Sequence, residues 1–221
     1  MKKLAINALN ICDDISNIDS YLLVIKNKKI LYKILSNSDL QYEDSYIQIL
    51  DENYKELKLS DYVDFISSII NLDSNSKKNL NVLIRRIKKE EIEILRSTSE
   101  KINEILEECA KQIKINSPIN ISYDIEVDED DIIKLLSLSL QDDSPDLIDR
   151  INNYINISFE LRGIKIFVFY NLLAFLEENE LDSLIRTNKY NGIKIIDIEN
   201  VEFKTSIFDH IKILDEDICV I

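Results

Sequence analysis

The sequence predicts an α/β domain with a helical segment inserted near its middle. Residues 163–172 and 192–200 are apolar runs separated by a helix-like stretch, and such runs are typical of strands buried in a parallel sheet. Residues 71–114 contain neither glycine nor proline, and apolar residues recur there every three or four positions, as on one face of a helix. We therefore expect an α/β head formed by residues 1–70 and 118–221, and a helical leg formed by residues 71–117.

The first seventy residues are predicted to be mainly strands. Residues 21–25 and 29–34 flank a turn-like stretch, and residues 46–50 and 54–59 flank Asp51–Asn53, so each pair is predicted to form a hairpin. Residues 60–70 are expected to form a helix, because Ser60 can cap it and apolar residues share one face: Tyr62, Phe65, Ile66 and Ile69.

The helical leg should end before Pro118 and can break at a capping box formed by Ser97 and Glu100. After it we expect an extended strand at 119–127, a helix beginning near Asp128, and a second helix capped by Ser144 or Asp146. The apolar strand 163–172, a helix at 177–190 and the apolar strand 192–200 form a strand–helix–strand unit. Two short edge strands are expected to close the chain after His210.

Scarce residue types exclude several classes of enzyme. The chain has one histidine, His210, which excludes a multi-histidine metal site and has no nucleophile motif around it. Its two glycines, Gly163 and Gly192, lie in neither of the common nucleotide-binding loops. The three cysteines form no C-x-x-C pair, and no apolar run approaches the roughly 18 residues that cross a bilayer. We expect a cytoplasmic protein without a membrane segment.

A block of positive charge stands out in a chain of net charge −14. Residues 77–89 carry six basic residues and no acidic one: Lys77, Lys78, Arg85, Arg86, Lys88 and Lys89. On a helix Lys78, Arg85 and Lys89 share a face, and such a surface binds nucleic-acid phosphates without sequence preference. The alternative is a solvated face whose charges pair with acidic residues of a neighbouring helix, such as those that follow at Glu90.

A block of negative charge follows the helical segment. Asp124, Glu126 and Asp128 would point to the same side of an extended chain, and Glu129 follows them. Clustered carboxylates of this kind suit Ca²⁺, which takes six to eight oxygen ligands, although the segment is not an EF-hand loop. The alternative is a solvated strand end followed by acidic residues that favour a helix N-terminus.

Two further interpretations concern the C-terminal part of the chain. Asp197 and Glu199 end an apolar strand, as in the second half of a nucleotide-hydrolase signature, although a strand-end turn explains them equally. Asp197, Glu202 and Lys204 fit the spacing of a metal-dependent nuclease. A third possibility is a protein–protein scaffold that uses the helical segment as a docking arm.

The order of the segments is informative as a whole. The helical insertion, DIEVDE (124–129), IFVFYNLLAFL (166–176) and the terminal ILDEDICVI (213–221) follow one another along nearly the whole chain. This layout resembles the small DNA-end-binding protein of type II-A CRISPR systems, which acts in spacer acquisition.

The resemblance implies a head similar to the P-loop NTPase fold without the phosphate loop, and a helical leg. It implies a non-enzymatic protein that forms a homotetrameric ring. Double-stranded DNA ends pass into the hole of this ring, and bound Ca²⁺ stabilises the assembly. The matching positions assign calcium to Asp124, Glu126, Asp128 and Glu129, and DNA to the six basic residues of 77–89. The implied partners are the spacer integrase complex and the RNA-guided effector nuclease.

Overall fold

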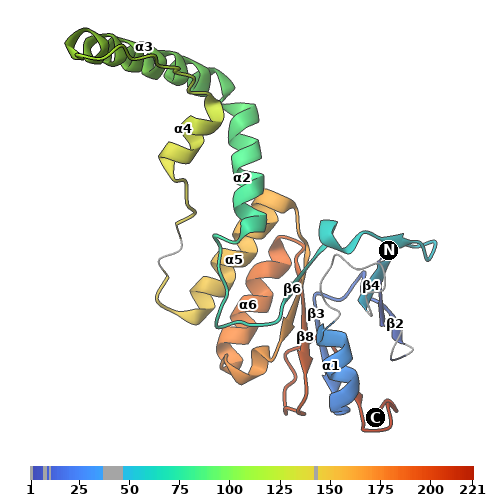
Figure 1. Cartoon of the computed structure of the whole chain (residues 1–221). Coiled ribbons are helices and arrows are strands. Elements are labelled where there is room, and N and C mark those ends of the chain that lie inside the picture. Colours follow the sequence, from blue (N-terminus) through green and yellow to red (C-terminus); the bar gives the residue numbers. More distant parts are fainter. Residues whose placement is uncertain (1, 7–8, 10, 37–46, 142–143) are drawn as a thin grey trace. The chain divides into compact units, whose positions relative to one another are not determined.

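The computed structural model describes residues 2–6, 9, 11–36, 47–141 and 144–221. The chain divides into two compact units (Figure 1). We call residues 1–74 and 142–221 the α/β unit, and residues 75–141 the helical unit. The helical unit thus extends to Gln141 and includes residues 118–141, which the sequence had suggested for the head.

A five-stranded parallel sheet forms the centre of the α/β unit. Its strands follow the order β6 (Val63–Ile66), β7 (Ile166–Tyr170), β8 (Lys194–Glu199), β3 (Ser20–Ile25) and β9 (His210–Leu214). The predicted strand–helix–strand unit is present as β7, α6 (Glu178–Tyr190) and β8. The strand β9 lies at one edge, and after it only a single bridge joins Leu214 to Val220.

Successive residues of the central strands face opposite sides of this sheet, which explains why the strands are apolar throughout. On one side, Leu22 and Val24 pack with α6 and with α5 (Leu147–Arg162). On the other side, Tyr21, Leu23 and Ile25 pack with α1 (Lys28–Ser36) and with the second sheet. The α/β unit therefore has two cores, one on each face of the sheet.

The second sheet is antiparallel and contains β2 (Ile11–Asp14), β1 (Lys3–Ile6), β4 (Ile47–Leu50) and β5 (Glu56–Leu57), in that order. The pairing of β4 with β5 confirms the hairpin predicted around Asp51–Asn53, although Tyr46 of that prediction lies outside the described residues.

The predicted hairpin at 21–34 is wrong, because its second half is the helix α1. The Asn27 side chain accepts hydrogen bonds from the backbone N–H groups of Lys29 and Ile30, both at 3.2 Å, which satisfies the free donors at the start of the helix. Leu31 and Ile34 then face the core at a helical spacing. A helical cap and a three-residue period therefore outweigh the strand propensity of the isoleucines.

The predicted helix at 60–70 is also wrong: a short 3-10 turn (η2, Leu59–Asp61) leads into strand β6. Asp64 of β6 is buried and pairs with Arg162 at the end of α5, and the Tyr154 hydroxyl donates to the same carboxylate at 2.6 Å. A buried carboxylate requires such partners, and they are supplied by residues distant in sequence.

The helical unit consists of α2 (Lys77–Glu90), α3 (Ile92–Asn116) and α4 (Glu129–Leu136). The helices separate at Glu91, and α3 continues unbroken through the capping box predicted at Ser97. Residues 120–128 form no strand. None of the helices in the part of the chain that the structure describes is long and apolar enough to cross a membrane.

Two asparagines join distant parts of the helical unit. The Asn75 amide donates to the Leu140 carbonyl at 2.9 Å and accepts from the Leu140 N–H at 2.6 Å. The Asn103 amide pairs with Val127 in the same way, at 3.0 and 2.9 Å. Each asparagine thus replaces the missing backbone partner of one residue in the segment that returns after α3. These contacts explain why that segment belongs to the helical unit.

Candidate nucleic-acid interface

The basic block forms most of helix α2. Ser76 caps this helix by accepting a hydrogen bond from the Asn79 N–H at 3.4 Å. Lys78, Arg85 and Lys89 lie along one exposed face, as the sequence predicts, while Ile84 and Ile87 pack into the core of the helical unit. The helix therefore displays its positive charge to solvent and packs its half-buried apolar side against the rest of the helical unit.

Lys77 and Lys78 occupy the first turn of α2, and this turn contains no acidic residue. The first turn of a helix carries a partial positive charge, so lysines there are electrostatically unfavourable within the chain itself. The same position favours an external anion, because the backbone N–H groups of the first helical turn point outward there and two exposed lysines lie in this turn. This end of α2 is therefore well suited to a phosphate group.

Only two of the six basic residues are paired with carboxylates in the described parts of the chain. Arg86 pairs with Glu90 at 3.1 Å, and Lys88 pairs with Asp130 of α4. The Arg85 guanidinium donates to the backbone carbonyl of Asn81 at 3.2 Å and so keeps its full charge. The alternative of neutralisation by neighbouring acids thus applies to Arg86 and Lys88, whereas Lys77, Lys78, Arg85 and Lys89 keep an uncompensated positive charge.

The predicted calcium residues lie at the end of the returning segment. Asp128 caps α4 by accepting from the Asp131 N–H at 2.9 Å, and the Asp131 carboxylate accepts from the Asp128 N–H at 3.3 Å. A hydrogen bond from Lys134 is the main cause that lowers the pKa of Asp131. The role of acidic residues at a helix N-terminus, considered from the sequence, is therefore the role that Asp128 has here.

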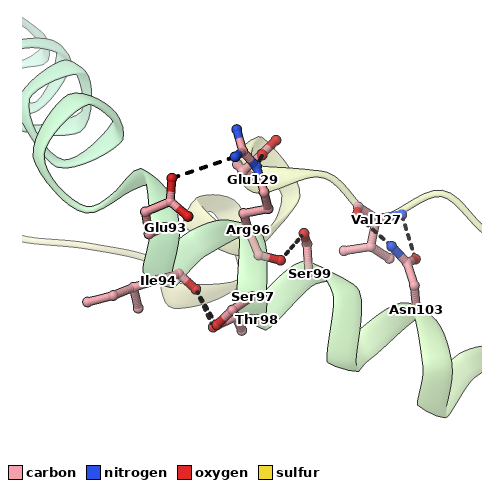
Figure 2. A network of polar contacts seen from close by, with 9 residues as sticks. All are labelled: Glu93, Ile94, Arg96, Ser97, Thr98, Ser99, Asn103, Val127 and Glu129. Carbon is pink, nitrogen blue, oxygen red and sulfur yellow. Dashed lines mark hydrogen bonds and ion pairs between the residues drawn. The ribbon is translucent and has the colours of Figure 1, made fainter.

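Glu129 forms an ion pair with Arg96 of α3, with 3.7 Å between the carboxylate oxygen and Nε, as Figure 2 shows. In the same view the Asn103 side chain, seven residues further along α3, is hydrogen-bonded to the backbone of Val127. Neither contact was predicted from the sequence, because neither Arg96 nor Asn103 belongs to a motif. Together they hold the acidic segment against the first half of α3.

The four carboxylates do not form a calcium cage within one chain. Among the described residues, no group of three or more histidine, cysteine or acidic side chains comes together in a way that could hold a metal ion. Asp124 and Glu126 are exposed, while Asp128 and Glu129 are engaged in the cap and the ion pair. Six to eight oxygen ligands would therefore require rearrangement or a second chain.

The residues of the nuclease alternative lie in different environments, because Asp197 is buried whereas Glu202 is exposed. Asp197 is 0% exposed, and its carboxylate accepts from the Leu172 N–H at 3.1 Å. Glu199 is also buried and accepts from the Leu173 N–H at 2.9 Å, and burial raises the pKa of both carboxyl groups. Glu202 instead pairs with Lys26 at 2.9 Å. A carboxylate that substrate and metal cannot reach does not support nuclease chemistry.

Between β3 and α1, a strand of the parallel sheet leads directly into a helix. The connection consists of Lys26 and Asn27, without glycine, so no phosphate-binding loop can form there. The two glycines instead end helices: Gly163 follows α5 with φ +71°, and Gly192 follows α6 with φ +65°.

Comparison with known proteins identifies the family. Residues 41–218 match the family described as CRISPR-associated protein (Cas_Csn2). The chain belongs to the Cas_Csn2 family. The resemblance expected from the order of segments is thus confirmed, and with it a CRISPR-associated role. No curated protein sequence matches the chain significantly.

Solved structures support the expected fold of this Cas_Csn2 chain. The crystal structure of Stu0660 of Streptococcus thermophilus aligns with a TM-score of 0.55 and 19% identity, over 96% of this chain and 74% of the other. The structure of cbiO1 from Clostridium perfringens, part of the ABC transporter complex cbiONQ, aligns with a TM-score of 0.50 and 15% identity, over 100% and 86%. The Cas_Csn2 fold is therefore α/β and similar to that of P-loop NTPases, as predicted.

Proposed function

We propose that this chain is a non-catalytic CRISPR accessory protein that binds double-stranded DNA ends without sequence preference. It acts in the cytoplasm, as a homotetrameric ring whose hole holds the DNA, and supports the acquisition of new spacers. Its partners are the spacer integrase complex and the RNA-guided effector nuclease. The observation that carries the DNA contact is the unpaired cationic face of α2, formed by Lys78, Arg85 and Lys89.

Charge segregation makes this binding possible for an acidic chain. Phosphates are bound where positive charge is local and uncompensated, whatever the net charge of the protein. Contacts to phosphates alone carry no sequence information, which fits a protein that must accept any DNA end.

The deciding experiment compares linear DNA with closed circular DNA of the same sequence in a gel-shift series. Binding to the linear form alone is expected, because a closed circle cannot enter a ring from its end. Equal affinity for both forms would reject end threading. Incubation of labelled DNA with the protein and Mg²⁺ or Mn²⁺ should give no cleavage products, and any cleavage would revive the nuclease alternative.

We also propose that Ca²⁺ binds at Asp124, Glu126, Asp128 and Glu129 and stabilises the assembly. The density of carboxylates and the family resemblance support this proposal. Because Asp128 and Glu129 already have partners within the chain, calcium would have to displace the Arg96 ion pair, or be completed by oxygen atoms of another copy. Native mass measured with and without Ca²⁺ tests whether the ion changes the oligomer.

A further inference from the structure

Two buried acids at the end of β8 hold the turn that follows β7. This turn is the 3-10 turn η3 (Leu172–Ala174). Its Leu172 N–H donates to Asp197 at 3.1 Å, and its Leu173 N–H donates to Glu199 at 2.9 Å. The first N–H groups of a helical turn have no partner within the turn, so the two carboxyl groups satisfy them. We call Asp197 and Glu199 the β8 carboxyl pair.

The β8 carboxyl pair is closed off from water. Asp197 and Glu199 lie two positions apart on the strand and therefore face the same side of the sheet, where they are 0% and 1% exposed. The residues beside them on the neighbouring strands are apolar: Leu22 and Phe169 flank Asp197, and Val24 flanks Glu199. These three residues pack in the core that α5 and α6 cover. The pair thus lies in an apolar environment.

The charged groups nearest to this core already have partners. Asp64 binds Arg162 and Tyr154 at β6, two strands away from β8. Lys26 and Glu202, which follow β3 and β8, form an ion pair with each other. Among the residues that the structure describes, the β8 carboxyl pair therefore has no cation as a partner, and its hydrogen bonds come from the backbone of η3.

A single proton would make this arrangement stable. The two carboxyl groups bind consecutive N–H groups and so lie close together, where two negative charges would repel each other. The Asp197 Oδ2 atom is buried and has no hydrogen-bond partner among the described residues, which is costly for a carboxylate oxygen. A proton on Oδ2 turns this atom into a donor towards Glu199. It leaves free the oxygen atoms that accept from Leu172 and Leu173.

We propose that the β8 carboxyl pair is a proton-dependent latch, which holds η3 closed while the pair carries one proton and releases η3 when that proton is lost. Loss of the proton leaves two charges in one apolar site, and release of the turn lets water reach them. Burial, together with the charge of Glu199, raises the pKa of Asp197, and burial raises the pKa of Glu199. A group with a raised pKa contributes its stability at low pH and loses it as the pH rises. The latch is therefore closed in acidic solution and opens as the pH increases.

The turn yields more easily than the strand. Asp197 and Glu199 belong to β8, which is hydrogen-bonded on both sides, to β7 and to β3. The turn is only three residues long, and Asn171 at its start has φ +58°, in the left-handed region that is uncommon for residues other than glycine. The Oδ1 atom of Asn171 is also buried without a partner among the described residues. Opening of η3 relieves both features.

Hydrogen exchange of the full-length protein without DNA tests the latch. Mass spectrometry of peptides that contain residues 171–176 gives the protection of these amides from about pH 5 to about pH 9, after division by the intrinsic exchange rates. Their protection should fall as the pH rises, with a limiting slope of about tenfold per pH unit for the loss of one proton. Peptides from β3 and β8 should keep their protection. A constant protection of η3, or an equal fall in the strands, would overturn the inference.

Neutral variants identify the group that carries the proton. In Asp197→Asn the side-chain oxygen still accepts from Leu172 and the new NH₂ group donates to Glu199, so η3 should stay protected at every pH. Glu199→Gln allows only one charge to form and should weaken the response. It provides the test if the first variant does not fold. A pH response as steep as that of the wild type in both variants would contradict the latch.

The matched control is Asp209→Asn. Asp209 is exposed, and it also accepts from two consecutive N–H groups, those of Asp19 at 2.8 Å and Ser20 at 3.1 Å. Its replacement should leave the pH response of η3 unchanged, and an equal loss of that response in Asp197→Asn and Asp209→Asn would reject the assignment to the β8 carboxyl pair. The inference is independent of the proposed function, because the basic residues of α2 belong to the other unit.

Discussion

The unpaired face of α2 makes a quantitative prediction about salt. Replacing Lys78, Arg85 and Lys89 together with glutamine removes three exposed positive charges and leaves the apolar side of the helix unchanged. Each phosphate contact contributes about 0.9 to the slope of log affinity against log salt concentration. If one copy of this face contacts the DNA, the slope should become shallower by about 2.7, and by more if several copies do.

The consequence for affinity follows from the same slope. Between 50 and 200 mM salt, wild-type binding should weaken about 40-fold more than binding by the triple variant. Gel-shift titrations with linear DNA at four or five salt concentrations measure both slopes. Because the substituted side chains are exposed, the melting temperature of the variant should stay close to that of the wild type.

The matched control uses a cation of the same helix that already has a partner. Replacing Arg86 and Glu90 together with glutamine removes an exposed arginine but leaves the net charge unchanged. Its slope should change by less than one contact, since this arginine reaches phosphate only by giving up Glu90. Equal slopes for the wild type and the triple variant, or equal losses in the triple variant and the control, would refute the assignment of the DNA contact to this face.

Three further predictions concern stability. Asp64→Asn should lower the free energy of unfolding by about 3–5 kcal/mol in urea titrations, because the nearly buried Arg162 loses its counter-ion, and a loss below about 1 kcal/mol would contradict this. Burial raises the pKa of Asp197, so its contribution to stability is complete below the unfolded-state pKa of about 4 and declines as pH rises towards the folded-state value. The free energy of unfolding of Asp197→Asn relative to wild type should therefore increase with pH above about 4, by at most about 1.4 kcal/mol per unit, whereas a constant difference would argue against this origin. Removing Ca²⁺ with a chelator should lower stability by about 2.7 kcal/mol if the ion was present at 100 times its dissociation constant, and the double variant Asp124→Asn, Glu126→Gln should not respond.

The sequence was most informative where local pattern alone decides the structure. The apolar runs at β7 and β8 admit few alternatives to buried parallel strands, and the long three- and four-residue stripe at 77–116 admits few alternatives to helices. Short segments were ambiguous. Residues 60–70 carry a helical spacing of apolar side chains, but Asp64 finds its partners on α5, 90 and 98 residues away. No pattern in the neighbouring sequence predicts those partners.

At the candidate site, too, local pattern predicted some features and tertiary packing decided the others. The identity of the basic residues and their shared face followed from helical geometry. Which of them remain uncompensated did not, because the pairing of Lys88 with Asp130 depends on how α4 packs. The carboxylates of 124–129 were read as a cluster from their spacing on a strand, but residues 120–128 form no strand. Asn103 and Arg96 hold that segment instead, and single polar residues of this kind carry no sequence signature.

The buried carboxyl end of β8 shows how this fold differs from that of a nucleotide hydrolase. In P-loop NTPases an acidic residue at a strand end holds Mg²⁺ beside the bound phosphates. Here Asp197 and Glu199 instead bind the backbone of η3 (Leu172–Ala174) and are closed off from solvent. Grafting a glycine-rich loop between β3 and α1 would therefore yield a protein that binds phosphate but has no metal-binding site beside it. Engineering a hydrolase from this scaffold would require moving η3 as well.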